Sequence, residues 1–303
     1  MYSRRPPPTA TPARDTENSY MLGKNAMREI LLLDNGSRRP QSTLALRDLA
    51  ARLTERVLQP VQPVSLAHSD LISAAKLAGQ PATTLEPWLV DRLRRGVQRF
   101  LIIPLFFGPS GALSEAIPAL AARLRADTGP LDVRLAAPLC PLPQGEPRLT
   151  AILLDRIATA TRETQLQPRR LVLVDHGSPS PKVNAARRWV AADLRSRLEA
   201  GIQVEEAAME RRAGPDYDFN GELLLEVLRR LARADRQSPI FIAPLFLFAG
   251  RHAGPGGDLD EIAAAVKAEY PELRIVLTGL VGDHPALLDI LASRYRETLE
   301  AGE

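Results

Sequence analysis

The sequence predicts an α/β protein of two tandem domains, each a doubly wound, mainly parallel four-stranded sheet flanked by helices. The first observation behind this prediction is an internal repeat, because "LLLDNGSRRP" from residue 31 closely matches "LVLVDHGSPS" from residue 171. The second is that short apolar runs alternate with longer stretches of helical periodicity, the pattern of strand–helix–strand units around a parallel sheet. Since these runs are almost continuously apolar, we expect helices on both faces of each sheet.

The repeat extends through most of the chain and sets the expected domain boundaries. Three pairs of landmarks recur in the same order about 140 residues apart, which indicates a duplicated domain. The pairs are Asn35 with His176, Pro104 with Pro244, and Pro147 with Pro285. We therefore expect an N-terminal domain over residues 26–165 and a C-terminal domain over residues 166–303. Residues 1–25, rich in proline and arginine, are expected to be a disordered leader.

Both copies divide into the same succession of elements, because apolar runs of strand length are separated by segments with helical spacing of apolar residues. In the first copy the expected strands cover residues 29–34, 64–68, 100–107 and 133–137, with helices near 42–58, 84–97 and 114–126. In the second copy the expected strands cover residues 170–175, 203–209, 239–248 and 274–279, with helices near 183–200, 221–234, 258–269 and 286–299.

The composition excludes several classes of protein. Hydrophobic residues make up 45% of the 303 residues and charged residues 25%, as in soluble globular proteins. The net charge is only +3 and the charges are interleaved, so we expect no nucleic-acid binding. No apolar run reaches the roughly 20 residues needed to cross a bilayer, and the leader lacks the apolar core of a secretory signal. We therefore expect a cytoplasmic protein without a membrane anchor.

Candidate site residues follow from the rule that ligands of doubly wound sheets bind at the carboxyl ends of the strands. His176 follows the first strand of the second copy, Glu210 follows its second strand, and His252 follows its third. Imidazole is a common metal ligand and a proton carrier near neutral pH, and a carboxylate can complete a divalent metal site or accept protons. With Cys140 as the single cysteine, any metal site must use such groups.

Each of these residues also has a simpler interpretation when taken alone. His176 lies in an Asp-His-Gly-Ser turn whose polar groups could merely satisfy the backbone. His252 could be a solvent-facing loop residue, and Glu210 a solvated charge beside Arg211 and Arg212. The occurrence of all three at one predicted sheet edge favours a shared site.

The remaining motifs give weaker signals. The glycine-rich loop 254–257 matches neither phosphate-binding glycine motif, so we expect it to give backbone room to a flat, bulky ligand. His284 precedes Pro285 and is expected to start the final helix. His68, aligned with Ala208, is expected to be structural or incidental, and Ser178 lacks the surroundings of a hydrolase nucleophile.

The strand ending in His-Gly-Ser, the later Pro-Leu-Phe strand followed by Gly-Arg-His, and the Glu-Ile helix after it resemble the CbiX-type sirohydrochlorin chelatases. These form the class II chelatase family of cobalamin and siroheme biosynthesis, and the resemblance spans nearly all of residues 28–300 as two chelatase-like copies. It implies a lyase that inserts Co²⁺ or Fe²⁺ into the tetrapyrrole sirohydrochlorin without ATP and without a cofactor beyond the substrate metal. It also implies that His176 and His252 bind the metal and assist removal of the pyrrole protons, with Glu210 at the family's acidic position.

The first copy departs from the family pattern. Asn35 stands at the first histidine position and Ala112 at the second, while Asp70 is aligned with Glu210. We expect the N-terminal domain to be a degenerate half that closes the cleft, and the C-terminal domain to carry the active site in a monomer. Arginines near the same edge could meet the carboxylates of the substrate, although each alone could be a solvated charge. These are Arg38, Arg39, Arg187, Arg188, Arg211 and Arg212.

Two other functions stay open at this point. One is a non-catalytic carrier of a tetrapyrrole or a metal. The other is an unrelated two-domain protein that binds a small anion in its cleft, in which case His176 and His252 would lie far apart. The choice of metal is also open, because imidazole and carboxylate sites accept several divalent ions.

Overall fold

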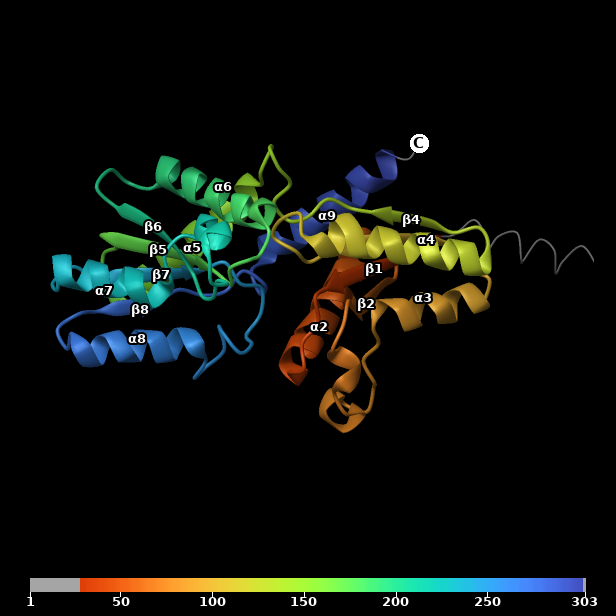
Figure 1. The fold of residues 1–303 in the computed structure, drawn as a ribbon, viewed down its shortest axis with the longest axis horizontal. Coiled ribbons are helices and arrows are strands. Elements are labelled where there is room, and N and C mark those ends of the chain that lie inside the picture. Colours follow the sequence, from red (N-terminus) through yellow and green to blue (C-terminus); the bar gives the residue numbers. More distant parts are fainter. Residues whose placement is uncertain (1–27, 302–303) are drawn as a thin grey trace, which may run out of the picture.

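Two four-stranded, all-parallel sheets make up the core of the computed structural model, which describes residues 28–301. The strand orders are β2-β1-β3-β4 and β6-β5-β7-β8, so the two sheets share one topology. They form two lobes placed side by side (Figure 1). The predicted fold class is therefore confirmed, whereas the predicted leader lies outside the described residues. None of the helices within residues 28–301 is both long and apolar enough to cross a membrane.

The elements follow the order expected from the repeat. The first sheet contains β1 (Glu29–Asp34), β2 (Val61–Ser65), β3 (Arg99–Pro104) and β4 (Asp132–Leu135). It is accompanied by α2 (Pro40–Val57), α3 (Leu85–Arg94), α4 (Ile117–Thr128) and α5 (Pro147–Thr164). The second sheet contains β5 (Arg170–Asp175), β6 (Gln203–Ala208), β7 (Ile240–Pro244) and β8 (Ile275–Leu277). Its helices are α6 (Pro181–Arg197), α7 (Leu224–Ala234), α8 (Asp258–Glu269) and α9 (Pro285–Glu300). Short helical turns lie at Ser69–Leu71, Ala74–Leu77, Ala112–Ala116 and Pro215–Asn220.

Three expectations about the elements were wrong in detail. Strand β2 covers residues 61–65 rather than 64–68, because the chain leaves the sheet after Ser65. The two Pro-Leu-Phe strands end at their prolines, and the phenylalanines beyond them belong to loops. Helix α5 was not predicted in the first copy, although its first residue, Pro147, had been matched to Pro285, which begins α9.

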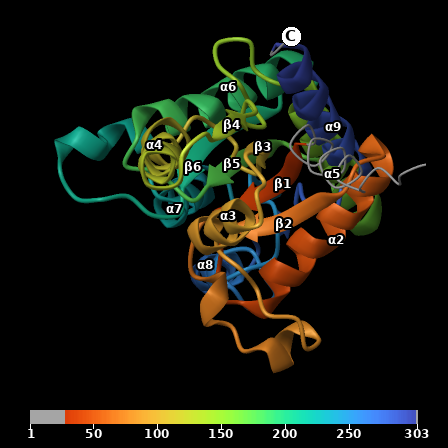
Figure 2. The same cartoon turned by 90° about the vertical axis from the view of Figure 1, so that its right-hand side faces the viewer.

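The closing helices of the two copies are exchanged between the sheets. Helix α5 ends the first copy but contacts β7, β8 and α6, whereas α9 ends the second copy but contacts α2 and β3. Arginines at equivalent positions hold the exchange, since Arg156 Nε donates to Leu280 O at 2.8 Å and Arg294 Nε donates to Pro138 O at 3.0 Å. In Figure 2, α2 and α9 lie on the same side of the first sheet, opposite α3 and α4. Each half therefore depends on the other to cover one face of its sheet.

The hydrophobic core reflects this exchange. One cluster spans both halves, with Leu32 and Leu101 from the first sheet and Leu171 and Phe241 from the second, all fully buried. Two smaller clusters lie under α3 and α4 on one side and under α7 and α8 on the other. The central cluster keeps the two sheets in a fixed relation, so the loops at their carboxyl edges face one another.

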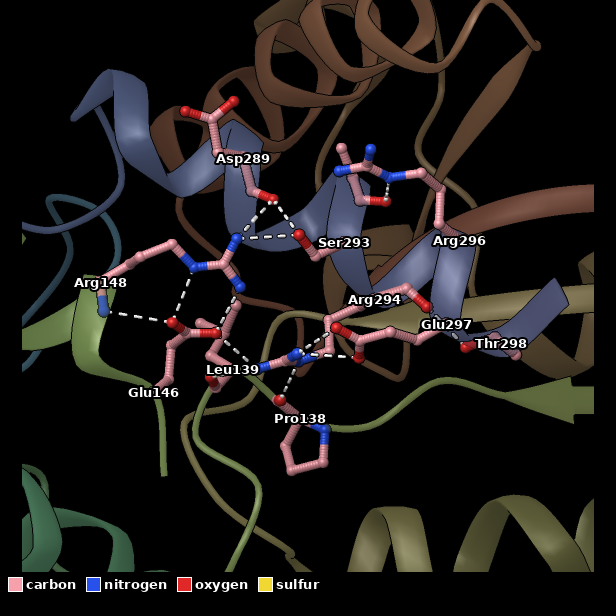
Figure 3. A network of polar contacts seen from close by, with 11 residues as sticks. Pro138, Leu139, Glu146, Arg148, Asp289, Ser293, Arg294, Arg296, Glu297 and Thr298 are labelled. Atoms are coloured by element: carbon pink, nitrogen blue, oxygen red, sulfur yellow. Dashed lines mark hydrogen bonds and ion pairs between the residues drawn. The ribbon is translucent and has the colours of Figure 1, made fainter. Parts of the chain in front are cut away.

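A polar network ties the start of α5 to α9 (Figure 3). Glu146 is only 3% exposed, and its Oε2 accepts from Nη2 of both Arg148 and Arg294 at 2.7 Å. Arg148 Nη1 continues the network by donating to Ser293 Oγ at 2.8 Å. Burial raises the pKa of Glu146, but the Arg148 hydrogen bonds and the two guanidinium charges outweigh it and lower the pKa below its ordinary value. Glu146 is thus a buried anion shared by the exchanged helices.

We expect Glu146→Ala to lower the free energy of unfolding by about 3–5 kcal/mol, because it removes the buried one of the two carboxylates that pair with the buried Arg294 guanidinium. Urea denaturation followed by circular dichroism measures the change. Glu297→Ala removes the other carboxylate beside Arg294, which is 54% exposed, and is expected to cost less than about 1 kcal/mol. Equal losses for the two variants would contradict the role given to Glu146.

Candidate metal-binding site

A cavity of about 350 Å³ lies between the two halves, where the loops after β1 and β3 meet those after β5 and β7. Its apolar walls come from both Pro-Leu-Phe segments, with Phe106 and Phe107 on one side and Phe246 and Phe248 on the other. This is the strand edge at which ligands of doubly wound folds bind. The cavity is therefore shared by the two copies rather than contained in one.

The three residues predicted to form the site come together at this cavity. His176, Glu210 and His252 each offer a ligand atom, and these atoms all lie within 4.8 Å of one another. The two imidazole rings are in contact, with centroids 4.5 Å apart and planes at 90°. One divalent ion with bonds of about 2.0–2.2 Å fits a group of this size, and three ligands leave coordination positions open. The anion-binding alternative required separated histidines and is contradicted.

The turns after β5 and β6 present His176 and Glu210 side by side. Glu210 N donates to His176 O at 3.0 Å, so the two ligands are joined through the backbone. Gly177 has φ +88, and a Cβ there would lie 1.9 Å from Glu210 O. Only glycine fits this position, because a side chain would push the two ligand-bearing segments apart.

Buried polar groups hold this turn from below. Arg187 Nη1 donates to Asp175 Oδ1 at 2.6 Å, and Asp175 Oδ1 accepts from Gly177 N at 3.0 Å. Arg187 Nη2 also donates to the carbonyl of Asn220, whose Oδ1 accepts from Ser178 N at 3.0 Å. Burial raises the pKa of Asp175, and the Arg187 guanidinium offsets part of the rise. The prediction that Arg187 meets substrate carboxylates is wrong, because it is 2% exposed and engaged with the protein.

A carboxylate that the sequence did not reveal lies beside His252. Nδ1 of His252 lies 2.6 Å from Oδ2 of Asp258, the first residue of α8, although the contact does not have the geometry of a hydrogen bond. The negative charge of Asp258 favours a cation bound to the same imidazole through Nε2. The sequence carried one signal for this contact. Asp258 directly follows Gly257, which indicates the start of a helix six residues after His252.

The glycine-rich loop between His252 and Asp258 packs against its own backbone. The expectation that residues 254–257 give room to a flat, bulky ligand was therefore wrong. A Cβ at Gly254 would lie 2.6 Å from Gly250 O, and one at Gly257 would lie 2.5 Å from Arg251 O. These glycines let the loop fold back on itself next to His252, and residues 254–257 do not line the cavity.

The first half has no metal-binding side chain at the position of Glu210, where it carries an alanine. Ala67 N donates to Asn35 O at 3.3 Å, as Glu210 N does to His176 O, so Ala67 rather than Asp70 is the counterpart of Glu210. The alignment of His68 with Ala208 was also wrong, because Ser65 bridges to Thr84 as Ala208 bridges to Leu223. Asn35 and the predicted counterpart Ala112 stand where the second half has its two histidines. The first half therefore lacks a metal-binding side chain at all three positions.

The other singled-out residues lie outside the cavity. His68 and Asp70 are exposed beyond β2. His284 caps α9 as expected, since its Nδ1 accepts from Ala286 N at 3.1 Å. Of the predicted arginines other than Arg187, none lines the cavity, and Arg211 pairs with Asp218 while Arg212 lies over the ring of Tyr217. Arg251, which the sequence did not single out for this role, does line it.

Asp34 is the second residue that sequence reasoning overlooked. It ends β1, as Asp175 ends β5, and it lines the cavity while being 9% exposed. Where α6 places Arg187, the matching position of α2 holds the buried Leu46. Burial raises the pKa of Asp34 to about 6, although hydrogen bonding to Ser65 and to the Gly36 backbone lowers it. Its Oδ1 has no hydrogen-bond partner within residues 28–301.

Comparisons with known proteins agree with the fold and the repeat. The CbiX family model matches residues 29–160 and again residues 170–298. The solved structure of SirB from Bacillus subtilis with Fe³⁺ is 18% identical, covers 91% of this chain and 98% of that chain, and has a TM-score of 0.65. SirB from Bacillus subtilis subspecies spizizenii in complex with cobalt is 18% identical, with coverages of 90% and 96% and a TM-score of 0.62.

A third solved structure is that of CbiX, described as the terminal enzyme for siroheme biosynthesis in denitrifying bacteria. It is 20% identical, with coverages of 89% and 99% and a TM-score of 0.56. Comparison with the curated proteins finds no match. At these identities the solved structures establish a common two-lobed fold, whereas the family model matches the sequence itself.

We expect Asp258→Asn to weaken Co²⁺ binding about 10–100-fold, because it removes a negative charge that lies 2.6 Å from Nδ1 of the metal-binding His252. Calorimetric titration with Co²⁺ measures the affinity. Glu261→Gln, on the exposed side of the same first turn of α8, is expected to leave it unchanged. An unchanged affinity in Asp258→Asn would show that Asp258 does not support the ligand.

We expect Asp34→Asn to become more stable than the wild type as the pH rises from 4 to 8. A pKa raised to about 6 means that the folded state favours the neutral carboxyl. Its contribution to the free energy of unfolding is therefore present below pH 4 and lost above pH 6. The difference should approach roughly 3 kcal/mol at pH 8. Urea denaturation at several pH values measures it, with the exposed Asp70→Asn as control. A difference that does not vary with pH would contradict the expected shift.

Proposed function

This chain belongs to the CbiX family, and on that premise we propose that it inserts a divalent metal ion, Co²⁺ or Fe²⁺, into sirohydrochlorin without ATP. The activity would serve cobalamin or siroheme biosynthesis. The observation that carries the proposal is the convergence of His176, Glu210 and His252, whose two histidines line a cavity shared by both halves. One such group occurs among residues 28–301, and it lies in the half that retains the family's histidines.

The ligand set suits a metal ion that is a substrate. A structural zinc site is closed by four protein ligands, whereas this group offers three, with His176 and Glu210 exposed. The ion therefore keeps positions at which pyrrole nitrogens can replace water. Imidazole and carboxylate ligands do not by themselves select between Co²⁺ and Fe²⁺, so the supply of metal and the geometry of the site decide the choice.

The cavity walls suit a flat, apolar macrocycle with charged substituents. Phe106 and Phe107 from the first half face the same cavity as Phe246 and Phe248 from the second, so a ring can contact aromatic side chains from both copies. Arg251, whose side chain is 70% exposed, can pair with a carboxylate at the edge of the ring. In this arrangement the N-terminal half binds the macrocycle and the C-terminal half delivers the metal.

We expect His176→Ala and His252→Ala each to reduce the insertion rate at least 100-fold, because each removes one of three metal ligands. The assay follows the absorption spectrum of sirohydrochlorin with Co²⁺ or Fe²⁺ under anaerobic conditions. His68→Asn is the matched control, since this exposed histidine adopts a left-handed backbone conformation that asparagine tolerates.

Asn35→His should restore nothing further in the first half, because Ala67 and Ala112 still supply no ligand there. Wild-type rates in both alanine variants would place the site elsewhere. A wild type that binds metal and macrocycle but inserts neither ion would instead indicate a carrier.

A further inference from the structure

Metal insertion needs a base that the three ligands do not provide. A divalent ion replaces two pyrrole N–H protons, so two protons must leave the macrocycle. A histidine that binds the ion through Nε2 has used that lone pair, and His252 Nδ1 faces Asp258 at 2.6 Å. Proton removal and metal binding therefore require separate groups at the moment when the ion is transferred.

The cavity offers few candidates for this base. Its titratable side chains are Asp34, Asp175, His176, Arg187, Arg251 and His252. The histidines are the proposed ligands, and arginines stay protonated. Asp175 Oδ1 already accepts from Arg187 at 2.6 Å and from Gly177 N at 3.0 Å. Among the described residues, Asp34 is the one carboxyl that lines the cavity without an ion pair to an arginine.

From this geometry we infer that Asp34, in the half that has lost its metal ligands, is the base that removes the pyrrole protons; the inference rests on the proposed chelatase function. Asp34 ends β1 at the wall of the shared cavity, and its Oδ1 is left without a hydrogen-bond partner inside residues 28–301. A buried carboxylate oxygen without a partner is costly, and it gains one when it takes a proton from a ring nitrogen.

No cationic side chain among the described residues compensates the charge of Asp34. Strand β2 contributes the Ser65 hydroxyl, and the cavity that Asp34 lines is otherwise walled on this side by Ser42 of α2 and by the phenylalanines after β3. The titratable groups beyond β2, His68 and Asp70, are exposed, and those across the cavity are the second-half residues named above. Burial therefore dominates and raises the pKa of Asp34 to about 6, near the value at which a general base works best.

The proton transfer balances in atoms and charge. The pyrrole N–H bond breaks, an O–H bond forms on Asp34, and the electron pair left on nitrogen becomes the bond to the incoming metal ion. Asp34 then releases its proton to water through the cavity and is ready for the second N–H. The histidines and Glu210 give up the ion as the ring nitrogens replace them.

The test is the pH dependence of insertion by Asp34→Asn, with Co²⁺ as the metal. We expect kcat at pH 8 to fall about 100-fold, and the difference from the wild type to shrink below about pH 6, where the carboxyl of Asp34 is itself protonated. Co²⁺ affinity and KM for the macrocycle should not change, because Asp34 is not one of the three ligands. Asp34→Glu should recover part of the rate, and Asp70→Asn should match the wild type.

The outcomes separate this inference from the proposed function. If Asp34→Asn keeps the wild-type kcat and pH profile while His176→Ala is inactive, Asp34 is not the base although the protein is a chelatase. If Asp34→Asn loses Co²⁺ affinity in proportion to activity, its role is structural and the inference also fails. A wild type that inserts no metal overturns both. Circular dichroism at each pH verifies that Asp34→Asn is folded.

Discussion

The exchange of α5 and α9 is the constraint on which the rest of the structure depends. Each helix packs on one face of the other copy's sheet, so the two halves share a single central core. The buried Glu146 and Arg294 fix the place where the exchanged helices meet. The hydrophobic core sets the distance between the sheets. The loops that line the cavity are therefore held in place by packing that lies far from the candidate metal-binding residues.

Within this shared frame the two copies have diverged at matching positions. The second half keeps Arg187 under its strand-end aspartate and two histidines above it, whereas the first half has Leu46 below and Asn35 above. The same backbone thus produces a paired carboxylate on one side of the cavity and an unpaired one on the other. Duplication has given one cavity two chemically different walls, which a symmetric pair of active sites could not offer.

The sequence was sufficient for the fold class and for the convergence of His176, Glu210 and His252, because strand ends in parallel sheets place such residues at one edge whatever the packing. It was not sufficient for Asp34, Asp258 or the buried position of Arg187. Their roles depend on which groups surround them in space, and sequence spacing does not record burial or partners. The alignment of Asp70 failed for a related reason, since the segments after β2 and β6 differ in length and only hydrogen bonds reveal that Ala67 is the true counterpart.

The position of α9 also has a consequence for how the protein is made. One face of the first sheet is completed by the helix at residues 285–300, so it stays uncovered while the second half is being translated. At roughly 5–20 residues per second, the chain needs many seconds to progress from α2 to α9. During that time α2 and β3 of the nascent chain expose the apolar surface that α9 later covers. We therefore expect a chaperone to bind these segments.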